Sequence, residues 1–97
     1  MIDIKTQELI KKIIFRYLDP KINHIFIFGS RADNTARRFS DIDIGIEGKN
    51  KTSSTVLSMI KADLDDSDIP YTVDVVDFLT ASINFKNIAK KNIISLN

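Results

Sequence analysis

Apolar residues recur at helical spacing in three segments of the chain and predict three amphipathic helices. Residues that suit a helix N-cap precede each segment. A proline follows the first two segments, and a proline cannot continue a helix. The first expected helix covers residues 4–18. The second begins at Thr52 or Ser53 and ends in the acidic run 63–68. The third begins at Thr80 or Ser82 and ends at about residue 93, with Phe85, Ile88 and Ala89 on one side.

Three shorter segments are rich in β-branched and aromatic residues and predict strands over 21–28, 41–47 and 71–77. The first becomes continuously apolar before Gly29, which indicates burial on both faces. The order helix, strand, strand, helix, strand, helix favours an α/β fold. We expect a small mixed sheet of about three strands packed by amphipathic helices. Residues 93–97 fit either a short extension or an edge strand.

The composition is that of one small globular domain over residues 1–97, with 43% hydrophobic residues and no room for a second core. The net charge of +1 and the scattered basic pairs give no indication of nucleic-acid binding, and none is expected. No apolar run approaches membrane-spanning length and the N-terminus does not resemble a signal peptide. We therefore expect a cytoplasmic protein that does not associate with membranes.

Two residue counts restrict the chemistry. The chain has no cysteine, which excludes disulfides, thiolate zinc sites and cysteine nucleophiles. His24 is the single histidine and sits early in the first predicted strand, where a structural or surface role is expected. Any metal held by this chain must therefore bind oxygen ligands, which favours Mg²⁺ or Mn²⁺ over Zn²⁺.

The most informative pattern is Gly29-Ser30, ten further residues, and then Asp41-Ile42-Asp43. Because side chains alternate along a strand, Asp41 and Asp43 share one face, about 6.5 Å apart along the chain. That spacing lets both carboxylates reach a shared hard cation beside a phosphorylated substrate. The alternative is a solvated edge strand whose outer face is acidic without cost.

The glycine–serine turn suits the binding of phosphate. Gly29 permits a positive φ and a close approach of the backbone to a ligand. Ser30 offers a hydroxyl and a backbone N–H at the expected start of a helical turn, where phosphate oxygens bind readily. The alternative is that the pair only turns the chain. The lysine of a P-loop is absent from this segment.

Asp74 interrupts a strand that is otherwise apolar and β-branched. An unpaired carboxylate buried there is costly, so a cation or hydrogen-bond donors are expected nearby. If the third strand lies beside the second, Asp74 joins Asp41 and Asp43, and three carboxylates can hold two divalent ions at a nucleoside triphosphate. Asp77 falls on the opposite strand face and is expected to have a loop or capping role.

Three arginines and one acidic run allow two interpretations each. Arg31, Arg37 and Arg38 can clamp phosphates with their planar guanidinium groups. Arg31 can equally form a structural ion pair, and the other two can be solvated loop charges. The acidic run 63–68 lacks the glycine and final glutamate of a calcium loop, so a solvated helix end is expected there.

Together these motifs resemble the polymerase-β-type nucleotidyltransferase superfamily, and within it the minimal nucleotidyltransferase (MNT) branch. The resemblance rests on Gly29-Ser30-Arg31-Ala32, on Phe39-Ser40-Asp41-Ile42-Asp43-Ile44 and on the later lone Asp74. It extends from the first helix through the third strand. MNT proteins are short bacterial and archaeal proteins, often paired as antitoxins with a HEPN-domain toxin.

The resemblance implies a nucleotidyltransferase of the matching fold that transfers AMP from ATP to a tyrosine of a cognate HEPN RNase toxin. It implies that Asp41 and Asp43 ligate two Mg²⁺ ions, and that Asp74 ligates one of them and helps to activate the acceptor hydroxyl. Gly29, Ser30 and Arg31 would bind the nucleotide, in a hetero-oligomer with the toxin. Two alternatives are a non-catalytic antitoxin of the same fold that neutralises the toxin by occlusion, and transfer to a small molecule such as an aminoglycoside.

Overall fold

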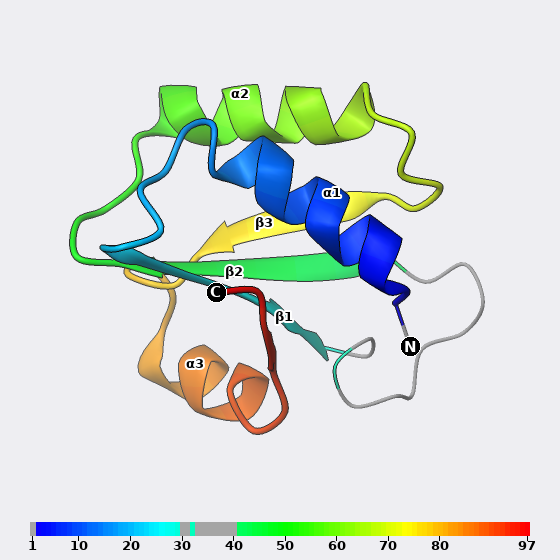
Figure 1. Cartoon of the computed structure of the whole chain (residues 1–97). Coiled ribbons are helices and arrows are strands. Elements are labelled where there is room, and N and C mark those ends of the chain that lie inside the picture. Colours follow the sequence, from blue (N-terminus) through cyan, green and yellow to red (C-terminus); the bar gives the residue numbers. More distant parts are fainter. Residues whose placement is uncertain (1, 30–31, 33–40) are drawn as a thin grey trace.

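The computed structural model describes residues 2–29, 32 and 41–97. Within these residues one mixed sheet has the strand order β3-β2-β1-β4. The central strand β1 is antiparallel to both of its neighbours, whereas β2 and β3 run parallel (Figure 1). The strands are β1 (Asn23–Phe28), β2 (Ile42–Gly48), β3 (Val73–Asp77) and β4 (Ile94–Ser95).

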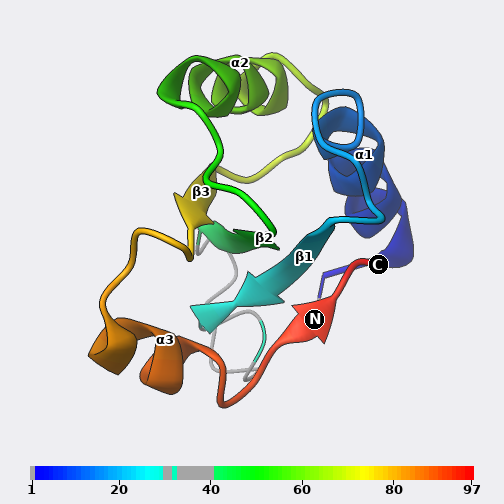
Figure 2. The same cartoon turned by 90° about the vertical axis from the view of Figure 1, so that its left-hand side faces the viewer.

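Helices cover both faces of the sheet, but unequally. The two longer helices α1 (Ile4–Ile14) and α2 (Ser54–Asp65) lie over one face, and the short helix α3 (Ile83–Ala89) lies on the other (Figures 1 and 2). The α/β class and the helical packing predicted from the sequence are confirmed. Among the described helices, none combines the length and the apolar character needed to cross a membrane.

The sheet has four strands where about three were predicted, because the chain end forms β4. Its two residues pair with Phe26 and Ile27 of β1. The side chain of Asn97 secures this edge: its Oδ1 accepts a hydrogen bond from the N–H of Ile25 at 2.8 Å. Its Nδ2 donates to the carbonyls of Pro20 and Asn23 at 3.0 and 2.8 Å. Of the two possibilities for the tail, the edge strand is correct.

Serine residues cap the second and third helices, which resolves both predicted alternatives. Ser53 Oγ accepts a hydrogen bond from the N–H of Val56, and Ser82 Oγ accepts one from the N–H of Phe85, both at 3.2 Å. The first helix ends at Ile14 instead of near residue 18. The N–H groups of Arg16 and Tyr17 donate hydrogen bonds to the carbonyls three residues earlier. This is the tighter 3₁₀ pattern, so the α-helix ends here.

The face of the sheet toward α1 and α2 is built mostly from isoleucine. Alternate residues of β1 and β2 point into this layer and are fully buried, together with side chains of both helices. Burying such a side chain stabilises the fold by about 1.5–3 kcal/mol relative to exposure. The principal members are Ile10, Ile14, Ile25, Ile27, Ile42, Ile44, Ile46, Ile60 and Leu64.

The opposite face holds a compact phenylalanine cluster, Phe26, Phe28 and Phe78. The Phe78 ring meets the other two edge-to-face, with centroid distances of 4.8 and 5.1 Å. Gly45 on β2 makes room for this cluster, since a Cβ there would lie 2.4 Å from the Phe26 ring. The glycine lets the rings pack directly on the backbone of β2.

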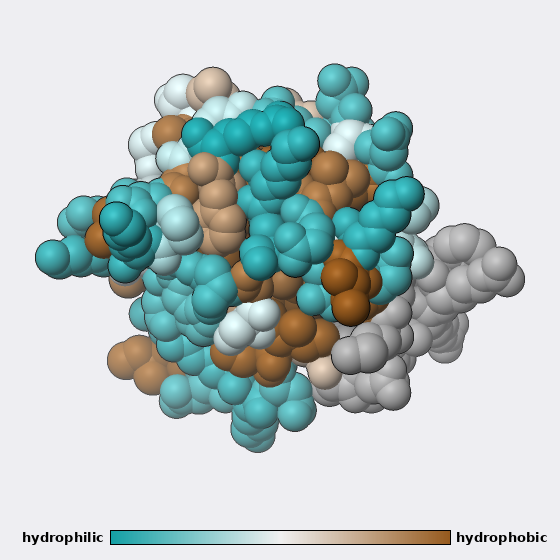
Figure 3. All heavy atoms as spheres, in the orientation of Figure 1, coloured by the Kyte–Doolittle hydropathy of each residue, from teal (hydrophilic) through white to brown (hydrophobic). Residues whose placement is uncertain are grey.

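Helix α3 covers this second face only thinly. The sequence pattern grouped Phe85 and Ile88 on one apolar side, yet the structure buries no residue of the helix. Ile83, Phe85 and Ile88 are 74%, 40% and 69% exposed. In the space-filling view the surface over α3 mixes hydrophobic and hydrophilic residues (Figure 3). Local periodicity is the same for a buried and an exposed apolar side, so the sequence did not distinguish them.

A hydrogen bond joins the chain after α1 to α2: the Tyr17 hydroxyl donates to Asp63 Oδ2. This bond raises the pKa of the Tyr17 phenol above its usual value, and desolvation and the negative charge of Asp63 act in the same direction. The protonated phenol is therefore favoured by folding. The stabilisation is complete below about pH 10, the pKa of an unfolded tyrosine, and is lost as pH rises through the higher folded pKa.

We expect the free energy of unfolding to fall more steeply above about pH 10 in the wild type than in Tyr17→Phe, because only the wild type loses this bond on ionisation. Urea titrations at a series of pH values measure both slopes. Lysine titration contributes equally to the two proteins and cancels in the comparison. Parallel slopes would contradict the proposed contribution of the bond.

Candidate active site

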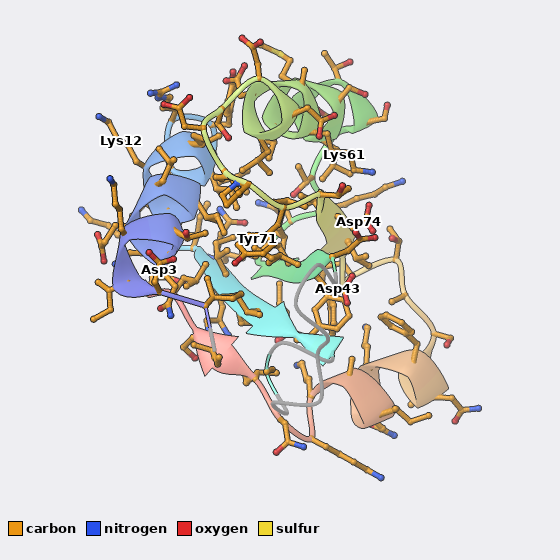
Figure 4. The ribbon with its side chains drawn as sticks, turned by 90° about the vertical axis from the view of Figure 1, so that its right-hand side faces the viewer. Asp3, Lys12, Asp43, Lys61, Tyr71 and Asp74 are labelled. Carbon is orange, nitrogen blue, oxygen red and sulfur yellow. The ribbon has the colours of Figure 1, made fainter. Side chains whose placement is uncertain are left out.

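The candidate site lies where β2 and β3 run side by side. Their parallel register places Asp43 directly beside Asp74. Both side chains point to the face opposite the isoleucine layer, with Asp43 half-buried and Asp74 exposed (Figure 4). Strand alternation fixes this face, because Ile42 and Ile44 flank Asp43 and occupy the buried layer. The condition set for Asp74 in the sequence analysis, that the third strand lies beside the second, is met.

The electrostatics of the site centre on Asp43. Burial raises the pKa of its carboxyl above the usual value, and the negative charges of Asp74 and then Asp41 raise it further. Two neighbouring carboxylates thus act on Asp43, and one of them, Asp41, immediately precedes the first residue of β2. A nearby cation would relieve both the repulsion and the desolvation.

The donor set fits a hard divalent cation such as Mg²⁺, which prefers carboxylate oxygens. Among residues 2–29, 32 and 41–97, no three acidic or histidine side chains already surround a common point. The structure therefore brings Asp43 and Asp74 together, with Asp41 near enough to act on Asp43 electrostatically. That all three ligate one metal pair stays a prediction.

Gly29, which directly follows β1, borders the candidate site next to Asp43. Its φ is +73°, as its place in the predicted turn allows. A Cβ on this residue would lie 2.5 Å from Asp43 Oδ2, so the backbone comes against the carboxylate itself. The backbone conformation therefore favours glycine here, and a Cβ would in addition force the Asp43 carboxylate to shift.

The other residues singled out in the sequence divide into two groups. Ser30, Arg31, Arg37 and Arg38 lie outside the described residues, so their roles stay predictions. Asp77 is buried and structural, as expected from its strand face: its carboxylate accepts hydrogen bonds at 3.0 Å from the N–H groups of two loop residues, Thr52 and Leu79.

His24 also has a structural environment. Its Nε2 lies 3.0 Å from Ser95 Oγ across the pairing of β1 with β4. Its ring packs 5.1 Å from that of Phe26. The residue is at the far end of β1 from Gly29, as predicted, and does not belong to the candidate site.

A cavity of about 250 Å³ shares Gly29 with the candidate site and was not predicted from the sequence. It lies between the end of β1 and the last turn of α3. Its wall is mostly apolar, with a single polar side chain, Asn92. The only sequence signal was the apolar side of the segment that forms α3. The lining residues are Phe28, Gly29, Phe85, Ile88, Ala89 and Asn92.

Comparison with known protein families agrees with this geometry. The family model described as "Polymerase beta, Nucleotidyltransferase" matches residues 8–96, nearly the whole chain. The chain belongs to the polymerase-β-type nucleotidyltransferase family. The resemblance predicted from the glycine–serine turn and the aspartates is confirmed, and the protein is a nucleotidyltransferase by family.

One curated relative lies in the MNT branch of this nucleotidyltransferase family. It is named "Probable protein adenylyltransferase MntA" and comes from Haemophilus influenzae. It is 34% identical over 91 residues, which cover 93% of this chain and 79% of the relative. At this identity and coverage the chain belongs to the MNT branch as predicted.

Solved structures share the nucleotidyltransferase fold. A toxin–antitoxin crystallised with AMP-PNP aligns with a TM-score of 0.78 at 24% identity, over 94% of this chain and 72% of the other. A Shewanella oneidensis structure of a tri-AMPylated HEPN toxin in complex with MNT antitoxin aligns with a TM-score of 0.65 at 23% identity, over 94% and 71%. At these identities the alignments establish the fold.

Gly29→Ala should destabilise the protein by about 1–3 kcal/mol, the cost of holding a residue with a Cβ in the left-handed region. The contact with Asp43 adds to this cost. In an Asp43→Ala background the carboxylate is gone, so the same substitution should cost less. Urea unfolding of the four proteins of this cycle measures the difference. An equal cost in both backgrounds would contradict the close approach of Gly29 to Asp43.

Proposed function

We propose that the protein is a Mg²⁺-dependent adenylyltransferase that transfers AMP from ATP to a tyrosine of a HEPN-domain RNase toxin and thereby acts as its antitoxin. The observation that carries this proposal is the pairing of Asp43 with Asp74, with the Gly29 backbone against Asp43. The name of the Haemophilus influenzae relative supports the reaction. The solved toxin–antitoxin structures, one with AMP-PNP and one with an AMPylated HEPN toxin, support the nucleotide and the partner.

In the proposed reaction the tyrosine hydroxyl oxygen forms a bond to the α-phosphorus of ATP. The bond from that phosphorus to the bridging oxygen of the β-phosphate breaks, and pyrophosphate leaves. The hydroxyl proton passes to the carboxylate of Asp74, which is exposed and can face an incoming protein. Ser30 and Arg31 bind the triphosphate at the turn that Gly29 begins.

Asp41 and Asp43 would hold two Mg²⁺ ions, one of them shared with Asp74. When bound, the ions neutralise charge that develops on the attacking and leaving oxygens. The residues of the chain contribute mainly by position. Asp43 is held by the sheet between Phe28 and Asp74, its neighbours in the strand pairing. A rigid strand holds a ligand more precisely than a loop does.

The acidic cluster favours an enzyme over an antitoxin that acts by occlusion alone. Like charges beside a half-buried carboxylate oppose folding, as the raised pKa of Asp43 indicates. A surface that only covers a toxin does not require this destabilising repulsion between carboxylates. Because Asp74 faces solvent, the acceptor hydroxyl can arrive from a partner protein, which supports a hetero-oligomer with the toxin.

Asp43→Asn and Asp74→Asn should each lower AMP transfer by at least about a hundred-fold, the usual effect of removing a group that stabilises charge in a transition state. The assay follows labelled ATP into a purified HEPN-domain toxin, with Mg²⁺ and with EDTA. Asp65→Asn makes the same charge change on an exposed residue of α2 and should transfer at the wild-type rate. Circular dichroism confirms that each variant is folded.

Two outcomes would contradict the proposal. Transfer by Asp43→Asn and Asp74→Asn at the wild-type rate would remove these residues from the reaction. A wild-type protein that inhibits the RNase without modifying it, and whose two variants inhibit equally, would favour occlusion. Metal dependence is tested by the same assay, since EDTA should abolish transfer and added Mg²⁺ should restore it.

A further inference from the structure

We infer that the cavity between the end of β1 and α3 binds the adenine ring of ATP, with Phe85 and Ile88 forming its wall and Asn92 selecting the base. This inference rests on the proposed function and extends it to nucleotide specificity. The first support is position. Gly29 lines the cavity and also lies against the carboxylate of Asp43. A nucleotide with its phosphates at the carboxylates therefore has this cavity next to it.

The second support is the chemistry of the wall. Phe28 and Phe85 stand edge-to-face, with ring centroids 5.8 Å apart and an interplanar angle of 87°. Ile88 and Ala89 add aliphatic surface from the last turn of α3. Aromatic and aliphatic side chains of this kind stack against the flat face of a nucleobase. Ligand pockets are typically apolar with a few polar groups that fix orientation.

The third support is the one polar side chain of the wall. The Asn92 amide is exposed and has no hydrogen-bond partner in the part of the chain that the structure describes. An asparagine amide can donate from its NH₂ group to N7 of adenine and accept at its oxygen from the amino group at N6. The corresponding edge of guanine carries two acceptors. Asn92 is therefore placed to favour ATP over GTP.

Exposure of α3 is consistent with a ligand that covers it. Phe85 and Ile88 leave 40% and 69% of their surface in solvent, and both face the cavity. Ile83 is equally exposed, at 74%, but does not line it. Ile83 and Ile88 are therefore similar exposed residues of one helix, and only Ile88 belongs to the inferred site. Ile83 can serve as the control position.

Calorimetric titration of the purified chain with Mg·ATP, Mg·GTP and Mg·tripolyphosphate tests the inference without any transfer reaction. Phe85→Ala should weaken Mg·ATP binding about ten-fold, as expected when one aromatic surface is removed from a stacked base. Ile88→Ala should weaken it about three-fold, in proportion to the smaller contact. Both variants should bind tripolyphosphate as the wild type does.

Two further variants complete the test. Asn92→Leu should bring the affinities for ATP and GTP to the same value, and Ile83→Ala should bind all three ligands as the wild type does. Ile88→Ala keeps the test valid if Phe85→Ala fails to fold, because Ile88 has no part in the phenylalanine cluster. Wild-type affinity for Mg·ATP in both Phe85→Ala and Ile88→Ala would overturn the inference.

The outcomes also separate this inference from the proposed function. Cavity variants that bind ATP normally but no longer modify the HEPN partner would show that the cavity receives the acceptor segment, and would overturn the assignment to adenine. Binding of ATP that depends on the cavity, in a protein that transfers no AMP, would overturn the proposed function alone. Transfer of AMP with cavity variants unchanged in binding would overturn only the cavity assignment.

Discussion

The site depends on the parallel pairing of β2 with β3. This pairing places Asp43 beside Asp74, and it requires a crossover, because parallel strands cannot be joined by a tight turn. The crossover is α2, which packs Ile60 and Leu64 against the isoleucine layer. One topological feature therefore buries the core on one face and brings two carboxylates together on the other.

The two faces of the sheet differ in how completely helices cover them. The isoleucine face is fully covered by two helices and provides most of the buried apolar surface. The phenylalanine face is only partly covered, and the candidate site opens beside it. Phe28 is the neighbour of Asp43 across the β1–β2 pairing, so apolar rings lie near the acidic group. Partial desolvation of Asp43 follows from this arrangement, and it strengthens any interaction with a cation.

Much of the site could be predicted because strand parity fixes which residues share a face. Asp43 follows from strand parity and Asp74 from its place in an apolar strand, whereas Asp41, which lies just before β2, stays a prediction as a ligand. The edge strand β4 could not be predicted with certainty, because two residues carry no local signal and Asn97 secures them through distant contacts. The cavity beside Gly29 was missed for a similar reason, since it arises from packing between segments far apart in the chain.

Gly45 leaves space for a ring of the phenylalanine cluster, and this constrains which residues can occupy the two positions in related proteins. The ring of Phe26 occupies the volume that any side chain at position 45 would need, so these two positions share one fixed space. Glycine weakens a strand locally, and here packing of the ring offsets that weakness. In a relative that carries alanine at the equivalent of Gly45, the equivalent of Phe26 must therefore be smaller. The two positions should vary together across evolution, as a coupled pair rather than as separate sites.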